Sequence, residues 1–315
     1  MGESAIGGRG PWRRCLLRMG GLGLVLGLLG GCDKPAPVEG PRYAAAPTAA
    51  DSRVHYVFAV HPLHNPQLLH KKFEPLMRHL AAHMPGVAFD LDASNNYADY
   101  EGKLRQRVPA FSLPNPYHAT LARGWGYRVI AKMADDEAFR GIFLVRKDSP
   151  VREPADLKGK VVAYPAPTAL AAAMMPQLYL QEHGVDVETQ LDNQYVGTHN
   201  SAIMNVYLGQ SAASATWPVA WEAFRKANPR EAAELKVVWQ TPRLIQNAVI
   251  VRDDVPPAVA AQVAALLAGL QDSAEGRAVL EGIDTRGFEL SDDRQFDVVV
   301  AFLREYERKV KKKPQ

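Results

Sequence analysis

Short apolar runs alternate with longer segments of helical spacing from residue 54 to residue 310. The runs have the length of buried strands, and segments such as Gln67–His83 repeat their apolar residues at the period of a helix. This alternation is typical of an α/β protein with largely parallel sheets, which we predict here. The predicted strands are Val54–Val60, Phe89–Ala93, Ala110–Leu113, Arg128–Ala131, Ile142–Arg146, Lys160–Ala163, Leu191–Val196, Ser211–Thr216, Lys236–Gln240 and Ala248–Arg252, and further helices are predicted at Asn96–Gln106, Pro257–Ser273 and Asp292–Val310.

Two of the predicted strands share one sequence pattern. Phe143–Pro150 and Val249–Pro256 each contain an apolar strand ending in Val-Arg, then a charged pair, one further residue and a proline. About a hundred residues separate them, which is enough for one small α/β lobe. The repeat predicts two lobes joined by two crossing strands, with lobe 1 formed by residues 53–144 and 248–310 and lobe 2 formed by residues 145–247. Such a hinge permits closure around a ligand.

The first residues have the pattern of a targeting segment. Four arginines precede the apolar run Gly20–Leu29, which is too short to span a membrane comfortably. Leu29-Gly30-Gly31-Cys32 resembles a bacterial lipobox, so we expect residues 1–31 to be a signal peptide and Cys32 to carry the lipid. The alternative is an ordinary secretory signal with an incidental cysteine.

Residues 32–52 are rich in Pro, Ala and Gly and predict a flexible tether between the anchor and the folded body. Asp33 resembles an inner-membrane retention signal, so we expect the protein on the periplasmic face of that membrane, with the outer membrane as the alternative. The other cysteine, Cys15, lies inside the signal, so the mature chain has no disulfide to form and depends on its core.

Charge argues against nucleic acid as a partner. Of 37 basic and 34 acidic residues, four basic and one acidic precede Cys32. The chain from Cys32 onward therefore has a formal net charge of zero. Several of the remaining basic residues lie in a terminal tail, residues 311–315, and just before it at Arg308 and Lys309. The rest of the chain therefore has no broad basic face for nucleic acid.

The stretch Gly159–Met175 is a candidate ligand-binding segment. It contains a short apolar strand, a proline-broken loop and a predicted helix that opens at Thr168. A hydroxyl residue at a helix N-cap leaves free backbone N–H groups near the positive end of the helix dipole, which suits an anion or another acceptor-rich ligand. The alternative is that Thr168 simply caps an ordinary surface helix.

Several short motifs occur in a fixed order across residues 54–304. They are Val60-His61-Pro62, Asn65-Pro66, Phe73-Glu74-Pro75-Leu76, Asn96-Tyr97, Val145-Arg146-Lys147-Asp148-Ser149, Asp156-Leu157-Lys158-Gly159-Lys160-Val161 and Thr198-His199-Asn200. Their order and spacing resemble those of the type II periplasmic solute-binding proteins of the phosphate/phosphite/phosphonate transporter group. That resemblance implies a monomeric, non-catalytic receptor without a cofactor, which captures an oxyanion or phosphonate-like solute between two lobes and delivers it to a membrane permease.

The same resemblance implies where the ligand is bound. The family uses an aromatic residue at a helix start, a histidine after a strand, a polar loop after another strand and the helix start of the Gly159–Met175 stretch. The corresponding residues here are Tyr97, His199, the loop residues Asn115, Tyr117 and His118, the pair Thr168 and Ala169, and Trp217.

Two of these places depart from the family pattern. Phosphonate binders carry a run of serines and threonines at the helix start, whereas this chain keeps Thr168 between Ala166-Pro167 and Ala169. Each missing hydroxyl removes a hydrogen bond worth roughly 0.5–1.5 kcal/mol. Trp217 also stands where the family tends to carry acidic residues, and an indole offers stacking area and one donor. Both departures favour a less charged or more aromatic ligand.

Other chemistry is less well supported by the sequence. His79 and His83 have the spacing of a helical metal pair but lack the intervening carboxylate of a metalloprotease, and exposed helix histidines are the simpler interpretation. His61 closes the first strand and is positioned to face the cleft. No nucleophile motif or Gly-rich phosphate loop is present. The remaining alternatives are a sensor subunit for a membrane kinase or enzyme and, third, a periplasmic enzyme.

Overall fold

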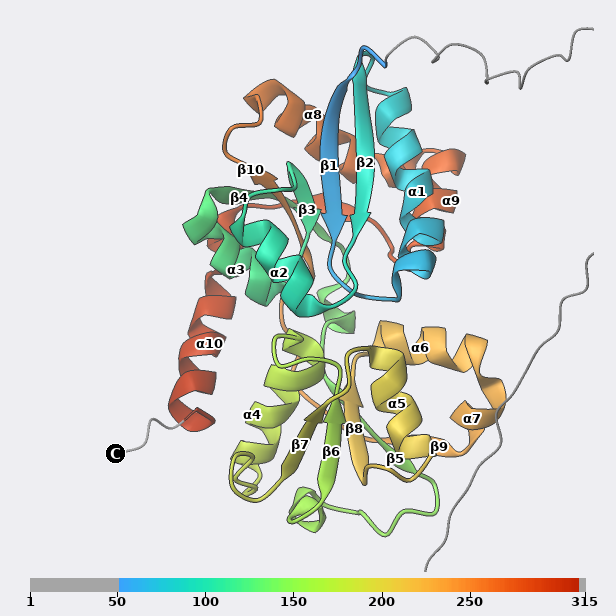
Figure 1. Ribbon diagram of the computed structural model, residues 1–315, viewed down its shortest axis with the longest axis vertical. Helices are drawn as coiled ribbons and strands as arrows, with labels where there is room; N and C mark the ends of the chain where they lie inside the picture. The colour runs from blue at the N-terminus through green and yellow to red at the C-terminus, as the bar shows by residue number, and fades with distance from the viewer. Residues whose placement is uncertain (1–50, 312–315) are drawn as a thin grey trace, which may run out of the picture. The chain divides into compact units, whose positions relative to one another are not determined.

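The computed structural model describes residues 51–311. The expected signal peptide, Cys32, and most of the expected tether and basic tail lie outside the described residues. The described chain folds around two β-sheets, each covered by helices, and these form two lobes (Figure 1). Among residues 51–311, no helix is both long and apolar enough to cross a membrane.

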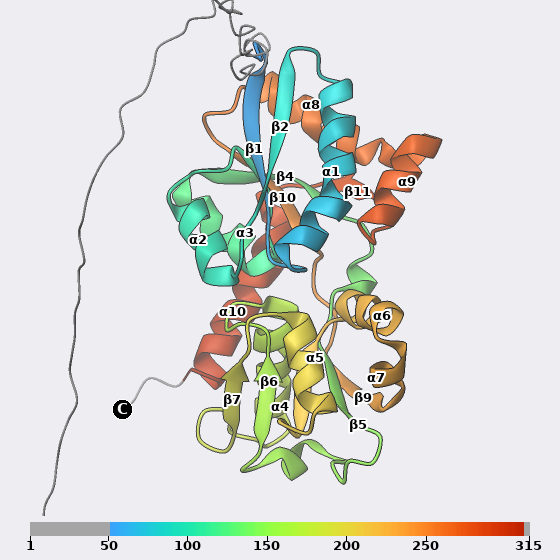
Figure 2. The same cartoon turned by 45° about the vertical axis from the view of Figure 1, so that its right-hand side comes forward.

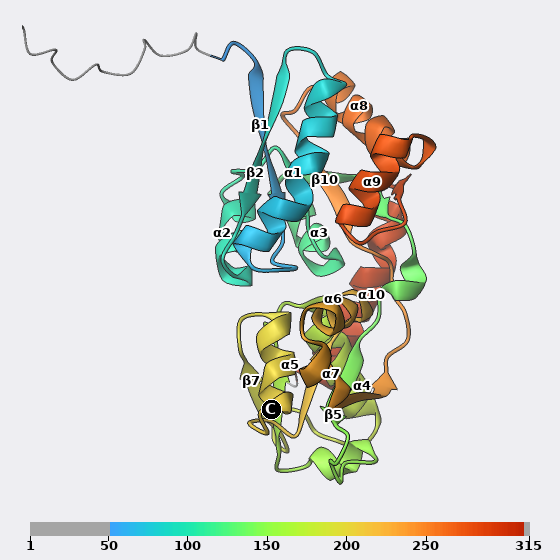
Figure 3. The same ribbon diagram turned by 90° about the vertical axis from the view of Figure 1, so that its right-hand side faces the viewer.

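Lobe 1 contains a six-stranded sheet with the order β11-β4-β10-β3-β1-β2. The buried faces of these strands pack against helices that include α1, α8 and α9 (Figure 3). The elements are β1 (Val54–Val60), α1 (Pro66–Ala82), β2 (Val87–Ala93), α2 (Tyr97–Arg105), β3 (Phe111–Leu113), α3 (Pro116–Ala122), β4 (Tyr127–Met133), β10 (Ala248–Arg252), α8 (Pro257–Ala268), α9 (Ala274–Gly282), β11 (Phe288–Leu290) and α10 (Asp297–Lys309), with short 3₁₀ turns at Arg123–Trp125, Asp136–Ala138, Leu270–Asp272 and Asp293–Phe296.

Lobe 2 contains a five-stranded sheet with the order β7-β6-β8-β5-β9. Its helices lie between β6 and β9 in the chain, and α4 and α5 are seen beside the sheet in Figures 1 and 2. The elements are β5 (Ile142–Arg146), a 3₁₀ turn at Pro154–Leu157, β6 (Val161–Tyr164), a π-helical turn at Leu170–Met174, α4 (Met175–Glu182), β7 (Asp192–Tyr195), α5 (His199–Tyr207), β8 (Ala213–Thr216), α6 (Pro218–Ala227), α7 (Pro229–Ala233) and β9 (Leu235–Gln240).

Both sheets are mixed, so the prediction of largely parallel sheets was wrong. β1 runs parallel to β2 and β3, and β6 runs parallel to β7 and β8. The strands next to the interlobe connections run the other way: β10 is antiparallel to β3 and β4, and β5 is antiparallel to β8 and β9. A strand that enters a lobe from the connection has to run opposite to strands that end at it, which is the physical reason for the mixture.

Local sequence explains why the first helix begins where it does. The side chain of Asn65 accepts a hydrogen bond from the backbone N–H of Leu68 at 2.9 Å, and Pro66 occupies the first helical position, where no N–H is needed. Leu69, Phe73 and related apolar residues of α1 are then fully buried against the sheet. The sequence prediction of Gln67–His83 agrees with these bounds within one residue.

Two crossover segments, residues 134–141 and 241–247, connect the lobes. They hydrogen-bond to each other: the Thr241 N–H donates to the Gly141 carbonyl at 2.9 Å, the Gly141 N–H donates to Thr241 Oγ1 at 2.9 Å, and the Leu244 N–H donates to the Phe139 carbonyl at 2.9 Å. The expected lobe boundary at residue 144 falls inside β5, which belongs entirely to the lobe 2 sheet. The crossing therefore takes place before β5 and before β10, in the two segments that precede the repeated strands.

Helix α10 contacts both lobes. It packs on α3 of lobe 1 and on α4 of lobe 2 (Figures 1 and 2). The Tyr306 hydroxyl donates to Gln177 Oε1 at 2.5 Å, the Gln177 amide donates to the Tyr195 hydroxyl at 2.9 Å, and Lys309 pairs with Glu182. The terminal helix thus forms a third connection between the lobes, beside the two crossover segments.

Candidate functional site: a pocket between the lobes

A small pocket with a cavity volume of about 20 Å³ lies between the two lobes. Its lining comes from the ends of β1, β3 and β8, the start of α2, the Leu170–Met174 turn and both crossover segments. Polar groups at strand ends beside an interlobe connection are the usual setting of a ligand site in an α/β fold. The lining residues are His61, Leu63, Tyr97, Asn115, Phe139, Ala169, Leu170, Ala171, Ala172, His199, Trp217 and Asn247.

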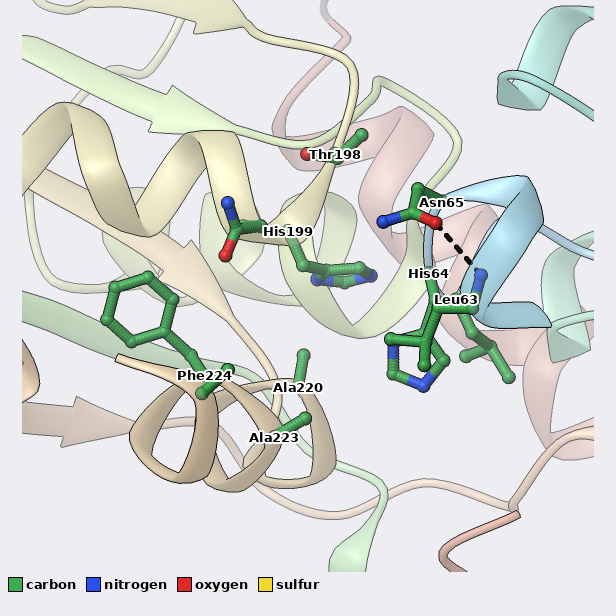
Figure 4. A pocket seen from close by; sticks show the side chains of 11 residues that line it. Leu63, His64, Asn65, Thr198, His199, Ala220, Ala223 and Phe224 are labelled. Atoms are coloured by element: carbon green, nitrogen blue, oxygen red, sulfur yellow. Dashed lines mark hydrogen bonds between the residues drawn. The ribbon is translucent and has the colours of Figure 1, made fainter. Parts of the chain in front are cut away.

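A second, larger hollow shares Leu63 and His199 with this pocket. It lies between the segment that leads into α1 and the helices α5 and α6, and Figure 4 shows His64 and Leu63 on one side facing His199 and Ala220 on the other. The hollow continues the pocket between the lobes. Its remaining lining residues are Asn65, Leu68, Thr198, Asn200, Ala223, Phe224 and Ala227.

His61 presents a hydrogen-bond acceptor to the pocket. Its Nδ1 lies 2.7 Å from the Leu113 carbonyl oxygen, which accepts only, so Nδ1 carries the proton and donates. Burial lowers the pKa of this imidazole to about 3, and the ring is therefore neutral at physiological pH. In a neutral ring with its proton on Nδ1, the lone pair resides on Nε2. The sequence pointed to this residue through its position at the end of the first strand and through the motif Val60-His61-Pro62.

His199 is the first residue of α5 and lies where the sequence predicted a ligand-binding histidine. The side chain of Thr198 caps the helix by accepting from the Ser201 N–H at 3.0 Å, which fixes the direction in which His199 leaves the helix. The ring Nδ1 lies 3.0 Å from Thr216 Oγ1. Burial, with His64 and His61 adding to it, lowers the pKa of His199 to about 3, so this imidazole is also neutral.

Asn115 lines the pocket, but its polar atoms are largely engaged within the protein. Its Oδ1 accepts from the backbone N–H and from Nδ1 of His118, both at 3.0 Å. Its Nδ2 donates to the Thr168 carbonyl across the gap between the lobes at 2.9 Å. Asn115 therefore links the lobes at the pocket wall, and its second amide hydrogen is what it has left for a ligand.

Tyr117 and His118 do not line the pocket. His118 is completely buried behind it, with Nε2 lying 3.4 Å from Glu101 Oε2, and Tyr117 packs edge-on against the His118 ring. The reason is local: Asn115 caps α3, and the helical turn that begins at Pro116 carries the next two side chains away from the strand end. The expected rigid loop is instead the start of a helix.

The predicted helix start at Thr168 was wrong. Thr168 lies in a turn, and a π-helical turn begins two residues later at Leu170, preceded by Ala169, whose side chain cannot cap it. The N–H groups of Ala169, Ala172 and Ala173 are already used in bonds to the carbonyls of Ala166 and Ala169. Thr168 contributes its carbonyl to Asn115 and does not line the pocket, whereas Ala169 does. Five of the eight expected ligand-binding residues thus meet at the pocket: Tyr97, Asn115, Ala169, His199 and Trp217.

Aromatic side chains form part of the pocket wall. Trp217 and Tyr97 are each 4% exposed, and the Trp217 ring lies 6.0 Å from the Phe139 ring in an edge-on arrangement. Within residues 51–311, neither the Trp217 indole N–H nor the Tyr97 hydroxyl has a described hydrogen bond, so both remain available to a ligand. Burial raises the pKa of Tyr97 well above its usual range, which keeps its hydroxyl protonated.

Seven lining residues were not among the predicted contacts. Leu170, Ala171 and Ala172 lie in the Gly159–Met175 segment that the sequence singled out, and the other four are His61, Leu63, Phe139 and Asn247. Phe139 and Asn247 lie on the two crossover segments, where no periodic pattern marks a residue as inward-facing. Asn247 is 1% exposed, and its Oδ1 has no hydrogen-bond partner within the described part of the chain. Its Nδ2 lies 3.7 Å from the sulfur of Met133.

The described residues contain no group of three or more His, Cys, Asp or Glu side chains placed to hold a metal ion. His79 and His83 stack, with ring centroids 4.3 Å apart. The interpretation of both as exposed helix histidines was wrong for His79, which is 6% exposed, whereas His83 is exposed. His79 Nδ1 lies 3.2 Å from Glu275, and His83 Nδ1 donates to the His79 carbonyl at 2.8 Å. The first contact links α1 to α9, and the second holds the His83 side chain against the last turn of α1.

Two hydrogen-bonded crossover segments and a pocket between two α/β lobes define a solute-binding protein of the two-lobed periplasmic type. Sequence comparison makes this more specific. The family model described as "ABC transporter, phosphonate, periplasmic substrate-binding protein" matches residues 58–296, and the chain belongs to this family. Both the fold class and the family predicted from the sequence are confirmed.

Known relatives are distant in sequence. A probable ABC transporter phosphite-binding protein, PhnD1 of Prochlorococcus marinus (strain MIT 9301), is 25% identical over 125 residues, which cover 37% of this chain and 42% of that protein. The match therefore spans less than half the length of this curated relative.

Solved structures share the fold over most of the chain. A binding-protein component of a Pseudomonas aeruginosa ABC phosphonate transporter has a TM-score of 0.75 at 16% identity, covering 82% of this chain and 88% of that one. The structure of P. marinus PhnD1 with methylphosphonate has a TM-score of 0.74 at 18% identity, covering 81% and 98%. The family consists by description of periplasmic binding proteins, which supports a binding role over an enzymatic one.

Proposed function

We propose that this protein is the receptor of an ABC-type importer, which captures a small polar solute between its lobes and presents it to a membrane permease. The observation that carries the proposal is the pocket itself, because its walls come from both lobes and from both crossover segments. A ligand that contacts both lobes stabilises their closed arrangement by its differential affinity for that state. The oxyanion or phosphonate-like ligand implied by the family is a separate hypothesis.

The hinge supports the same function. The three hydrogen bonds between the crossover segments hold the two chains side by side, while the lobes on either side have separate sheets. Short paired connections of this kind absorb domain closure without disturbing either core. The family match favours transport over the sensing alternative, since its description names a transporter component.

Small-angle X-ray scattering tests the proposal without knowledge of the ligand. The protein is measured before and after addition of a low-molecular-mass periplasmic extract, and the radius of gyration is expected to fall as the lobes close. The control is Ala223→Trp, because an indole at this half-buried position of the shared hollow would hold the lobes apart. An unchanged radius of gyration for the wild type in every fraction of the extract would contradict the proposal.

We also propose that the mature protein is anchored by a lipid on Cys32, on the periplasmic face of the inner membrane. The proposal is supported by the sequence Leu29-Gly30-Gly31-Cys32 and by Asp33 after it. Mass spectrometry of the N-terminal peptide is expected to show cleavage before Cys32 and the mass of the attached acyl chains. Cys32→Ser should appear in the soluble periplasmic fraction or remain uncleaved. A Cys32→Ser protein that is processed and sediments with membranes like the wild type would argue against the anchor.

A further inference from the structure

The chemistry of the pocket narrows the class of ligand, and this inference rests on the proposed function of the cleft as the capture site. Neither the pocket nor the adjoining hollow is lined by any lysine, arginine, aspartate or glutamate of the described chain. The titratable side chains that line these two spaces are three histidines and Tyr97. Burial lowers the pKa of His61 and His199 to about 3 and that of His64 to about 4, so all three rings are neutral at neutral pH. The site therefore offers no formal charge to a ligand.

Two groups in the pocket offer hydrogen-bond acceptors to a ligand. His61 has its proton on Nδ1, held by the Leu113 carbonyl, and so presents the lone pair of Nε2. Asn247 presents a buried Oδ1 that has no partner within residues 51–311. A buried acceptor left unpaired costs about 1–3 kcal/mol, and a ligand with donors in the right places removes that cost. A fully ionised oxyanion brings only acceptors to these two atoms.

The same pocket also contains donors for a ligand acceptor. The backbone N–H groups of Leu170 and Ala171, at the start of the π-helical turn, take part in no described hydrogen bond, and the Trp217 indole N–H is likewise available. π-helical turns occur frequently at functional sites. The pocket thus combines acceptors with donors, which is the requirement of a group that carries both kinds.

The walls favour a flat ring over a tetrahedral group. Trp217 and Phe139 meet edge-on, and the ring of His199 lies 6.4 Å from that of Trp217. Leu63 and the alanines at positions 169, 171 and 172 complete an apolar lining. Such surfaces gain from contact with an apolar or aromatic face and lose from burial of a charge that has no counter-charge.

We propose that the pocket selects an uncharged small heterocycle containing a cyclic amide or urea, whose N–H groups donate to His61 and Asn247 and whose carbonyl accepts from Trp217 or the Leu170–Ala171 backbone. A cyclic amide carries a donor and an acceptor in one plane, as the pocket requires. The missing hydroxyls of the Gly159–Met175 stretch follow from this, since a planar carbonyl needs fewer donors than three tetrahedral oxygens.

Isothermal titration calorimetry with four probes tests the proposal. Uracil and 2-pyrrolidone represent the uncharged class, and methylphosphonate and inorganic phosphate represent the anions. At least one uncharged probe is expected to bind with a measurable Kd, while the two anions give no binding heat. Binding of methylphosphonate but of neither uncharged probe would overturn this inference and leave the proposed function intact. Failure of all four probes would also overturn this inference, and the scattering experiment would then decide the proposed function separately.

Two variants locate the binding. Asn247→Leu replaces the buried amide by an apolar group of similar size and is expected to weaken binding of the uncharged probe about tenfold, because one ligand donor loses its partner. Trp217→Phe keeps an aromatic wall and removes the indole N–H, so it is expected to weaken binding severalfold even if Asn247→Leu fails to fold. Unchanged affinity in a folded Asn247→Leu and in Trp217→Phe would place the probe elsewhere and refute the assignment.

Discussion

Lowering the pH from 7 to 5 should destabilise the protein through the histidines of the cleft. His61 and His199 have pKa values of about 3 and His64 one of about 4, because burial disfavours their charged forms. In the unfolded chain each returns to about 6.5. Between pH 7 and pH 5 the unfolded state therefore binds protons that the folded state does not, and the free energy of unfolding falls with falling pH.

The magnitude follows from the same values. One pKa unit corresponds to about 1.4 kcal/mol, and the unfolded imidazole passes through its own pKa within this range, so each cleft histidine contributes a loss of about 2 kcal/mol between pH 7 and pH 5. His55 acts in the opposite sense, because Asp90 beside it raises its pKa, but it is exposed and its effect is screened by solvent. His118, whose pKa burial also lowers, acts in the same sense as the three cleft histidines.

Urea denaturation at pH 7 and pH 5, followed by circular dichroism, measures the effect. His199→Gln removes one of the three titrating groups and is expected to lose about 2 kcal/mol less than the wild type over this range. His70→Gln, at an exposed position of α1, is the matched control and should lose as much as the wild type. A wild-type free energy of unfolding that is constant between the two pH values, or an equal loss in His199→Gln, would refute the argument that these rings are held neutral by burial.

Two further predictions concern the connections around the site. Tyr306→Phe removes the hydroxyl that donates to Gln177 and should lower the free energy of unfolding by about 1–3 kcal/mol in urea melts, whereas an unchanged value would mean that this link between α10 and α4 contributes nothing. Gly141→Ala would place a Cβ 2.6 Å from the Ala171 carbonyl oxygen beside the pocket, so a loss of about 1–3 kcal/mol is expected by thermal unfolding. Gly102→Ala in α2, whose Cβ would make only an ordinary contact with Gln106 Nε2 at 4.0 Å, should be neutral or stabilising, and equal loss in both variants would contradict the steric reason.

Continuous apolar runs made the central strands predictable from the sequence. β1, β5 and β10 have the bounds that the sequence predicted, because each contains a run of buried apolar residues and is followed by polar residues or proline. β11 was missed, since one of its three residues is buried and two are exposed, which gives no apolar run. Strand direction was mispredicted because it depends on where the chain enters each lobe, and no local pattern encodes that.

The site was predictable where residues follow a strand and unpredictable where the backbone departs from regular structure. Tyr97 and His199 are the first residues of α2 and α5, Trp217 directly precedes α6, and all three line the pocket. Thr168 was assigned to a helix start that the π-helical turn moves two residues along. Asn247 belongs to no sequence motif, and the residues around it show no periodic apolar pattern. Only the fold of the crossover segment brings it to the pocket.

The position of Asn247 bears on how binding is coupled to closure. It lies in one crossover segment, Phe139 lies in the other, and both line the pocket that the two lobes enclose. The backbone of Phe139 also accepts one of the three hydrogen bonds that pair the crossover segments. A ligand that engages Asn247 and packs on Phe139 therefore acts directly on the hinge, in addition to joining the lobe surfaces. Because a ligand shifts a conformational equilibrium only by its differential affinity for the two states, contacts with the crossover segments favour closure to the extent that they differ between the open and closed arrangements. Asn247 and Phe139, which the sequence did not reveal, connect the ligand pocket to both crossover segments.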